Sequence, residues 1–199
     1  LAKMFGTFDL MVGYREAGVR LSETNLTEIV QQPGVEDAAG ILIPYMYESH
    51  PELRLDLPYY GVTDIPLGQQ FMALEAGSFP GSGEVALSSA WAKREGYQIG
   101  DTIRMAFPPY AEQDVKISGL LISHKRLSAG IALFERGWLE RATGRRGSTF
   151  VLVDTVKGTD QQRLVANLQQ RFPKLEYDVR KYLDEMRKNL NALRPMALG

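Results

Sequence analysis

The sequence predicts an α+β fold in which two β-α-β units pair into one lobe and a β-rich second lobe is inserted between them. Two observations predict this fold. Near both ends of the chain, a strand, an amphipathic helix that ends at a proline and a second strand follow one another. The intervening residues, 41–147, instead contain short β-type runs separated by turns. We therefore expect a discontinuous lobe of residues 1–40 plus 148–199, and an inserted lobe of residues 41–147.

The first unit begins with residues 7–12, Thr-Phe-Asp-Leu-Met-Val, which are expected to form a strand. The next helix begins at Ser22 or Thr24, whose side chains can accept hydrogen bonds from the first helical N–H groups. Its apolar face carries Leu26, Ile29 and Val30. The helix ends before Pro33, because proline cannot continue the hydrogen-bond ladder. Residues 35–47 are then expected to form the second strand.

The second unit repeats this order with a strand at 149–153 and a helix that ends at Pro173. Thr159 and Gln162 have the spacing of a capping box at the start of that helix. Its apolar stripe consists of Leu164, Val165, Leu168 and Phe172. Residues 175–179 resume as a strand. The alternative is a chance recurrence, because short strand-helix-strand runs are common.

The inserted lobe is expected to hold several short strands, with turn residues between them. These are residues 55–64, 84–87, 102–107, 115–123 and 131–134.

A last helix is predicted from Tyr182 onward, with an apolar seam along one side. The seam residues are Leu183, Met186, Leu190 and Leu193. Such a seam requires a packing partner, so the helix either folds back on this chain or continues toward a partner or a membrane.

The composition excludes several classes of function. The 199 residues include 23 Lys and Arg against 24 Asp and Glu, so a net charge of -1 provides no basic field for nucleic acid. Cysteine is absent, which removes thiol nucleophiles and cysteine metal sites. No apolar run in the sequence is long enough to span a bilayer, and the start lacks the features of a signal peptide. Because the chain also opens without methionine, we expect it to be a piece of a longer protein.

No catalytic, cofactor or metal site is predicted. His50 and His124 are the only histidines, and both are expected in solvated loops; Glu36-Asp37 is interpreted as a solvated strand edge. The glycine-rich stretch 77–83 lacks the Lys-Ser/Thr ending of a phosphate loop, which favours a turn before a strand. Arg145-Arg146 could bind an anion or form a basic hairpin turn between two glycines.

Residues 83–105 carry the most specific pattern in the chain. Gly-Glu-Val-Ala-Leu-Ser is expected to be a strand that leads into a short helix capped by Ser88 or Ser89. Gly96 would end this helix in a left-handed conformation, and Gly100-Asp101 would turn into a second strand. A further strand that contains Gly119 would pair beside it.

This pattern resembles the extracytoplasmic core domain of MacB-like ABC transporter permeases, also called the FtsX-like group. The family has Gly-Glu-Val-x-Leu-Ser, an alanine-bearing helix, Leu-Gly-x-x-x-Gly-Asp-Thr-Ile and a strand that ends in Val-x-Gly. Glu95 departs from it, since the family has leucine there. The structural motif residues that match are Gly83, Glu84, Val85, Ser88, Gly96, Gly100, Asp101, Thr102 and Gly119, together with Leu87, Ala92 and Ile103.

The resemblance implies a domain held between two membrane helices of its parent chain, at the extracytoplasmic face of the bacterial inner (cell) membrane. The β-α-β lobe would lie near the membrane, and residues 183–193 would lead into the second membrane helix. It further implies ATP hydrolysis on a separate cytoplasmic subunit or domain, with a cytoplasmic ATPase subunit as a partner. A second permease copy, an adaptor, a lipoprotein or a peptide are candidate further partners. The domain itself would not be an enzyme. It would transmit ATP-driven movement to export, lipoprotein release or cell-wall regulation.

An alternative function is an extracytoplasmic ligand- or peptide-binding or sensor domain that uses a groove between the lobes. A pocket lined by Tyr59, Tyr60 and Tyr110 would favour it. The transporter hypothesis instead places Leu1 and Gly199 on the same side of the fold.

Overall fold

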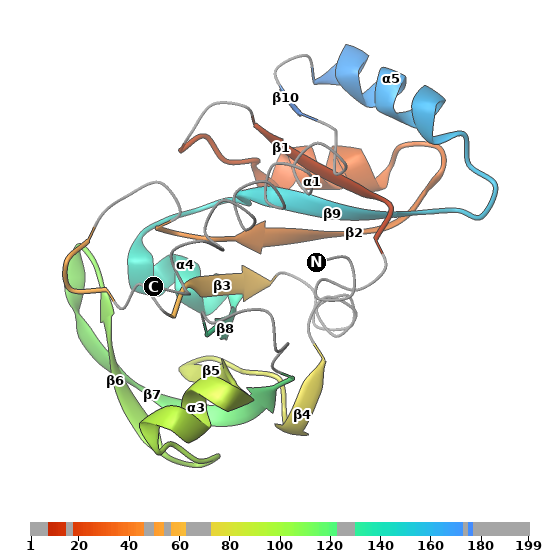
Figure 1. Cartoon of the computed structure of the whole chain (residues 1–199). Coiled ribbons are helices and arrows are strands. Elements are labelled where there is room, and N and C mark those ends of the chain that lie inside the picture. The colour runs from red at the N-terminus through yellow and green to blue at the C-terminus, as the bar shows by residue number, and fades with distance from the viewer. Residues whose placement is uncertain are drawn as a thin grey trace, which may run out of the picture.

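A computed structural model describes residues 8–14, 18–45, 50–53, 57–62, 73–122, 130–172 and 175–176 of the chain. Within this part, ten strands form one mixed sheet and four helices pack against it (Figure 1). Nine strands follow the order β10-β1-β9-β2-β3-β8-β5-β7-β4, and β6 pairs with β7 beside this path. The predicted α+β class is confirmed.

The elements have the following bounds in chain order. They are β1 (Leu10–Tyr14), α1 (Glu23–Val30), β2 (Val35–Leu42), β3 (Tyr59–Val62), β4 (Leu74–Gly77), β5 (Glu84–Ser88), α3 (Ser89–Glu95), β6 (Thr102–Phe107), β7 (Tyr110–Leu121), β8 (Ala132–Glu135), α4 (Arg136–Thr143), β9 (Phe150–Thr155), α5 (Gln161–Arg171) and β10 (Leu175–Glu176).

Strands from the two ends of the chain alternate in the sheet. β9 lies between β1 and β2 and is antiparallel to both, and β1 lies between β9 and β10. This order is that of two interleaved split β-α-β units. Helices α1 and α5 contribute Ile29, Leu164 and Leu168 to one apolar cluster on this half of the sheet. Alternation along β9 then directs Val151 and Val153 into that cluster.

The sheet continues without a break from these strands into the predicted insertion. β2 pairs with β3 through Ile41 and Val62, and β3 runs parallel to β8. The separation into lobes at 40/41 and 147/148 stays a prediction. The strand β2 extends from Val35 to Leu42 and therefore crosses the first of these boundaries.

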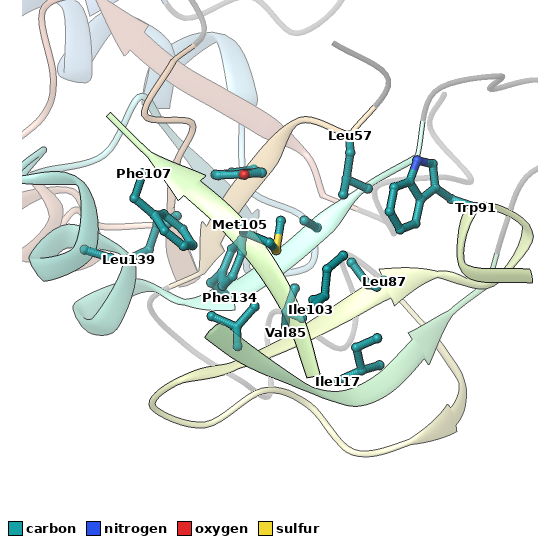
Figure 2. Packing of buried hydrophobic residues seen from close by; sticks show 14 of the residues in the cluster. Leu57, Val85, Leu87, Trp91, Ile103, Met105, Phe107, Ile117, Phe134 and Leu139 are labelled. Atoms are coloured by element: carbon teal, nitrogen blue, oxygen red, sulfur yellow. The ribbon is translucent and has the colours of Figure 1, made fainter. Parts of the chain in front are cut away.

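A second apolar core fills the space between the strands of the insertion and the helices α3 and α4. Figure 2 shows Phe107 and Phe134 side by side, with Leu139 of α4 next to Phe107. Trp91 of α3 lies in the same cluster and is 2% exposed. Complete burial of large aromatic and aliphatic side chains is the main stabilising contribution of this half.

Several predicted element ends differ from the structure. Ser22 caps α1 as expected, in a capping box whose second member is Asn25. The predicted Thr159 box is wrong, because Asp160 is the N-cap of α5 and accepts hydrogen bonds from the N–H groups of Gln162 and Arg163. β2 ends at Leu42, so the strand expected to reach residue 47 is shorter.

Some predictions fall on residues that the structure does not describe. These are the seam of Leu183, Met186, Leu190 and Leu193, the positions of Leu1 and Gly199, and His124. Among the described residues, no helix has the length and apolar character required to cross a membrane.

Four carboxylates gather where β9 ends. Asp154 lies opposite Asp37 in the sheet, and Asp9 accepts hydrogen bonds from the backbone N–H and hydroxyl of Thr155. Burial raises the pKa of the Asp154 carboxyl. The negative charges of Asp9, Asp37 and Glu36 raise this pKa further. The Glu36-Asp37 pair is therefore part of a repulsive cluster and not an isolated strand edge.

We predict that Asp154→Asn raises the free energy of unfolding at neutral pH by under about 1 kcal/mol, because the carboxyl is only partly buried and solvent screens much of the repulsion. A carboxyl group whose pKa is raised in the folded state stabilises the fold at pH values below its unfolded-state pKa of about 3.9. This stabilisation is lost as the pH rises through the folded-state pKa. Urea unfolding at about pH 4 and about pH 7 should therefore show a larger gain at pH 7. The control is Glu75→Gln, which removes one exposed carboxylate on β4, away from this cluster. Equal gains for Asp154→Asn at both pH values, or the same gains in the control, would contradict the prediction.

Candidate functional site

The motif residues of the 83–105 segment gather along both sides of β7. Lys116 of β7 donates its backbone N–H to the Gly83 carbonyl at 3.1 Å. On the other side, Gly100 donates to the Ile117 carbonyl and Ile117 donates to the Asp101 carbonyl, both at 2.8 Å. The motif therefore positions β5 and β6 against the same central strand.

The turn between α3 and β6 depends on two glycines and one carboxylate. Gly96 ends α3 with a φ of +81°, which confirms the predicted left-handed conformation, and Gly100 has a φ of +96°. The Asp101 side chain accepts a hydrogen bond from the Gln98 N–H at 2.7 Å, which closes the turn.

Ser88 has a different role from the expected helix cap. It occupies the N-cap position of α3, but its side chain makes no capping hydrogen bond there. Its hydroxyl instead accepts from the Ile131 N–H at 2.8 Å, and its own N–H donates to the Ile131 carbonyl at 2.9 Å. Ser88 therefore joins the end of β5 to the segment that enters β8.

The glycine-rich stretch 77–83 forms a turn before a strand, as predicted, although Gly77 belongs to the unpredicted strand β4. The Glu84 carboxylate accepts from the Gly81 N–H at 3.0 Å, which closes the turn. At Gly119, a side chain would collide with the carbonyl oxygen of Ser78, so glycine allows this turn to approach β7.

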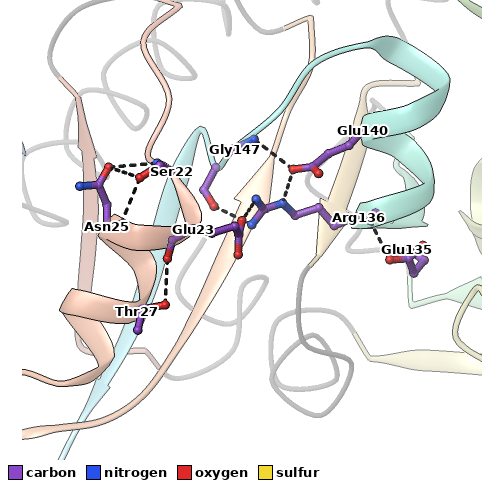
Figure 3. Close-up of polar contacts among 10 residues, drawn as sticks. Ser22, Glu23, Asn25, Thr27, Glu135, Arg136, Glu140 and Gly147 are labelled. Atoms are coloured by element: carbon purple, nitrogen blue, oxygen red, sulfur yellow. Dashed lines mark hydrogen bonds and ion pairs between the residues drawn. The ribbon is translucent and has the colours of Figure 1, made fainter.

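A buried arginine, Arg136, forms three side-chain hydrogen bonds, and no sequence pattern predicted them. The Arg136 side chain is 4% exposed. Arg136 is the first residue of α4, a helix that was not predicted. Its Nε donates to Glu140 and its Nη1 donates to Ser148, each at 2.9 Å, while Nη2 binds Glu23 of α1 (Figure 3). We refer to Arg136, Glu23, Glu140 and Ser148 as the Arg136 junction.

The Arg136 junction also involves the backbone around it. Gly147 donates its N–H to Glu140 at 3.0 Å. A Cβ at Gly40 on β2 would collide with the Ser148 hydroxyl and lie 2.7 Å from Arg136 Nη1. Glycine at position 40 therefore gives the guanidinium its space against the sheet.

The other residues that the sequence singled out do not form a common site in the described structure. Tyr59 is buried and donates its hydroxyl to the Ala106 carbonyl at 3.0 Å, whereas Tyr110 is 57% exposed. His50 lies beside a turn, but its ring packs edge-on against Tyr45, so it is less solvated than expected. Gly144 ends α4, so Arg145-Arg146 follow a helix and the predicted hairpin turn is wrong.

The sequence matches no protein-family model and no curated protein. Solved structures share the fold. The periplasmic region of MacB from Actinobacillus actinomycetemcomitans superposes with a TM-score of 0.64 at 10% identity, over 94% of this chain and 96% of that chain. The extracellular domain of the noncanonic ABC-type transporter YknZ from Gram-positive bacteria gives 0.61 at 14% identity, over 85% of this chain and 100% of that chain. The expected resemblance is therefore confirmed at the level of the fold.

We predict that Gly119→Ala lowers the free energy of unfolding by about 1–3 kcal/mol, because the added methyl group collides with backbone that cannot turn aside. Urea unfolding measures the loss. Gly81→Ala is the matched control, since a Cβ there meets only the Glu84 carboxylate at 3.4 Å. Equal stabilities of the two variants would contradict the close approach of residue 78 to β7.

Arg136→Met is expected to lower the free energy of unfolding by about 2–3 kcal/mol, because three charge-assisted hydrogen bonds are lost. The loss stays below that of a fully buried ion pair, since Glu23 reaches solvent. Arg141→Met, an exposed change on the same helix, should alter stability by less than about 0.5 kcal/mol. Thermal and urea unfolding of both variants check this, and a loss as small as that of the control would refute the junction.

Proposed function

We propose that this chain is the extracytoplasmic domain of a MacB/FtsX-like ABC transporter permease and that it transmits ATP-driven movement. The observation that carries the proposal is the pairing of the first and last described strands. β10 runs antiparallel beside β1, with Gly13 opposite Glu176 and Tyr14 opposite Leu175. β10 therefore runs back toward the end at which β1 begins, the direction that a domain suspended between two membrane helices requires.

The fold similarity supports the same function. One superposed structure is the periplasmic region of MacB and the other is the extracellular domain of an ABC-type transporter, and they cover 94% and 85% of this chain. Under this proposal the domain binds no ATP itself, and a cytoplasmic ATPase subunit drives it through the membrane helices. Export, lipoprotein release and cell-wall regulation are the tasks that such movement would serve.

A domain that transmits movement must resist internal deformation. Hydrogen bonds link every strand of the described sheet from β10 to β4, so displacement of β1 and β10 is carried to the insertion through β9, β2 and β3. The Arg136 junction adds a second connection between α1 and α4. Two independent connections favour a single rigid body over two freely hinged parts.

Cysteine labelling of the full-length protein tests the proposed location. The chain contains no cysteine, so Ser82→Cys in an exposed turn introduces a unique thiol in this domain. A membrane-impermeant maleimide should label it in intact spheroplasts. Leu87→Cys is the buried control and should react only after denaturation. Labelling of Ser82→Cys that requires membrane permeabilisation would refute the extracytoplasmic location.

The same preparation tests the transporter assignment. The detergent-solubilised full-length protein should co-purify with an ATPase encoded beside its gene, and the complex should hydrolyse ATP. External labelling without an associated ATPase would favour the alternative of a ligand-binding or sensor domain.

A further inference from the structure

An open groove of about 920 Å³ lies next to the Arg136 junction. It is bounded by the segment before α1, by α4 with the loop that follows it, and by the start of β7. The lining side chains used below are Arg20, Glu23, Tyr110, Glu140, Arg141 and Arg146. Its volume falls at the upper end of the range for ligand sites, about 300–1,000 Å³, and exceeds what a single small anion fills.

The carboxylates that line this groove are paired with an arginine, whereas two of its lining arginines are not paired with a carboxylate in the part of the chain that the structure describes. Its two lining carboxylates, Glu23 and Glu140, both bind the buried Arg136. Neither Arg141 nor Arg146 forms an ion pair within the described residues, and both side chains belong to exposed positions. The remaining lining arginine, Arg20, is already engaged, since it donates a hydrogen bond to the Pro44 carbonyl at 3.1 Å. Arg136, Arg141 and Arg146 together carry three positive charges against the two carboxylates, so the groove is locally basic although the whole chain has a net charge of -1.

Tyr110 adds an aromatic wall to the groove. It is 57% exposed, and its hydroxyl oxygen would lie 2.9 Å from a Cβ placed on Gly144. Glycine at position 144 thus allows the ring to rest against the end of α4. Exposed tyrosine together with arginine is characteristic of protein-binding surfaces.

We infer that this groove binds an acidic segment of a partner protein, whose carboxylates pair with Arg141 and Arg146 and whose backbone passes over Tyr110. A guanidinium group presents paired N–H donors that match a carboxylate. A peptide segment, unlike a free anion, also matches the groove volume of about 920 Å³. This inference goes beyond the proposed function and does not depend on it, because binding is measured with the isolated 199-residue chain.

Fluorescence anisotropy with a fluorescein-labelled decaglutamate peptide tests the inference. The unaltered chain should bind this peptide and not decalysine. The double variant R141E/R146E should bind at least about tenfold more weakly, since two charge-assisted contacts become repulsive. Tyr110→Ala should weaken binding by about threefold without any change of charge. Thermal unfolding should confirm that these variants remain folded.

The matched control is R94E/R163E, which makes the same change of net charge at exposed arginines on α3 and α5. It should leave the affinity within about twofold. An equal loss in this control, or unchanged binding by Tyr110→Ala, would overturn the assignment to this groove. Binding to vesicles of anionic phosphatidylglycerol with none to decaglutamate, or complete competition by millimolar inorganic phosphate, would also overturn it, in favour of a phosphate-binding site.

Discussion

The described structure depends on the burial of one charge. The Arg136 guanidinium is almost fully enclosed, so it must be paired, and its partners come from α1, α4 and the segment before β9. Because the guanidinium has a fixed planar geometry, these partners set the position of α4 relative to the interleaved β-α-β units. Glycine at position 40 is a consequence of the same constraint, since a side chain there would occupy the space of the arginine.

The sheet distributes this constraint along the whole described chain. β9 lies at the centre of the half that contains both β-α-β units, where strands from the beginning and the end of the sequence alternate. A strand with neighbours on both sides cannot slip by one residue, because the slip would exchange its two buried faces. Leu152 faces one apolar cluster while Val151 and Val153 face another, so this register is strongly specified.

Local patterns in the sequence predicted much of the fold. They could not predict contacts between residues that are distant in sequence. The helices α1 and α5 have apolar stripes, and the left-handed Gly96 follows from the residues around it. Helix α4 was missed because it begins directly after an apolar strand and contains Gly137, which disfavours a helix. The pairing of Arg136 with Glu23 spans 113 residues, and no local periodicity reports such a contact. The Thr159 error has a local cause, since Thr159 and Asp160 are adjacent and both can cap a helix.

The Arg136 junction and the groove beside it are linked through shared carboxylates. In isolation, Glu23 and Glu140 would offset two of the three arginines that line the groove. Because both bind the buried guanidinium, Arg136 offsets one of their two negative charges, and Arg141 and Arg146 form no ion pair within the described residues. The packing that holds α4 in place thus also determines the electrostatic character of the neighbouring surface. It follows that the groove cannot be understood from its lining residues alone, since its net charge also depends on Arg136, which does not line it.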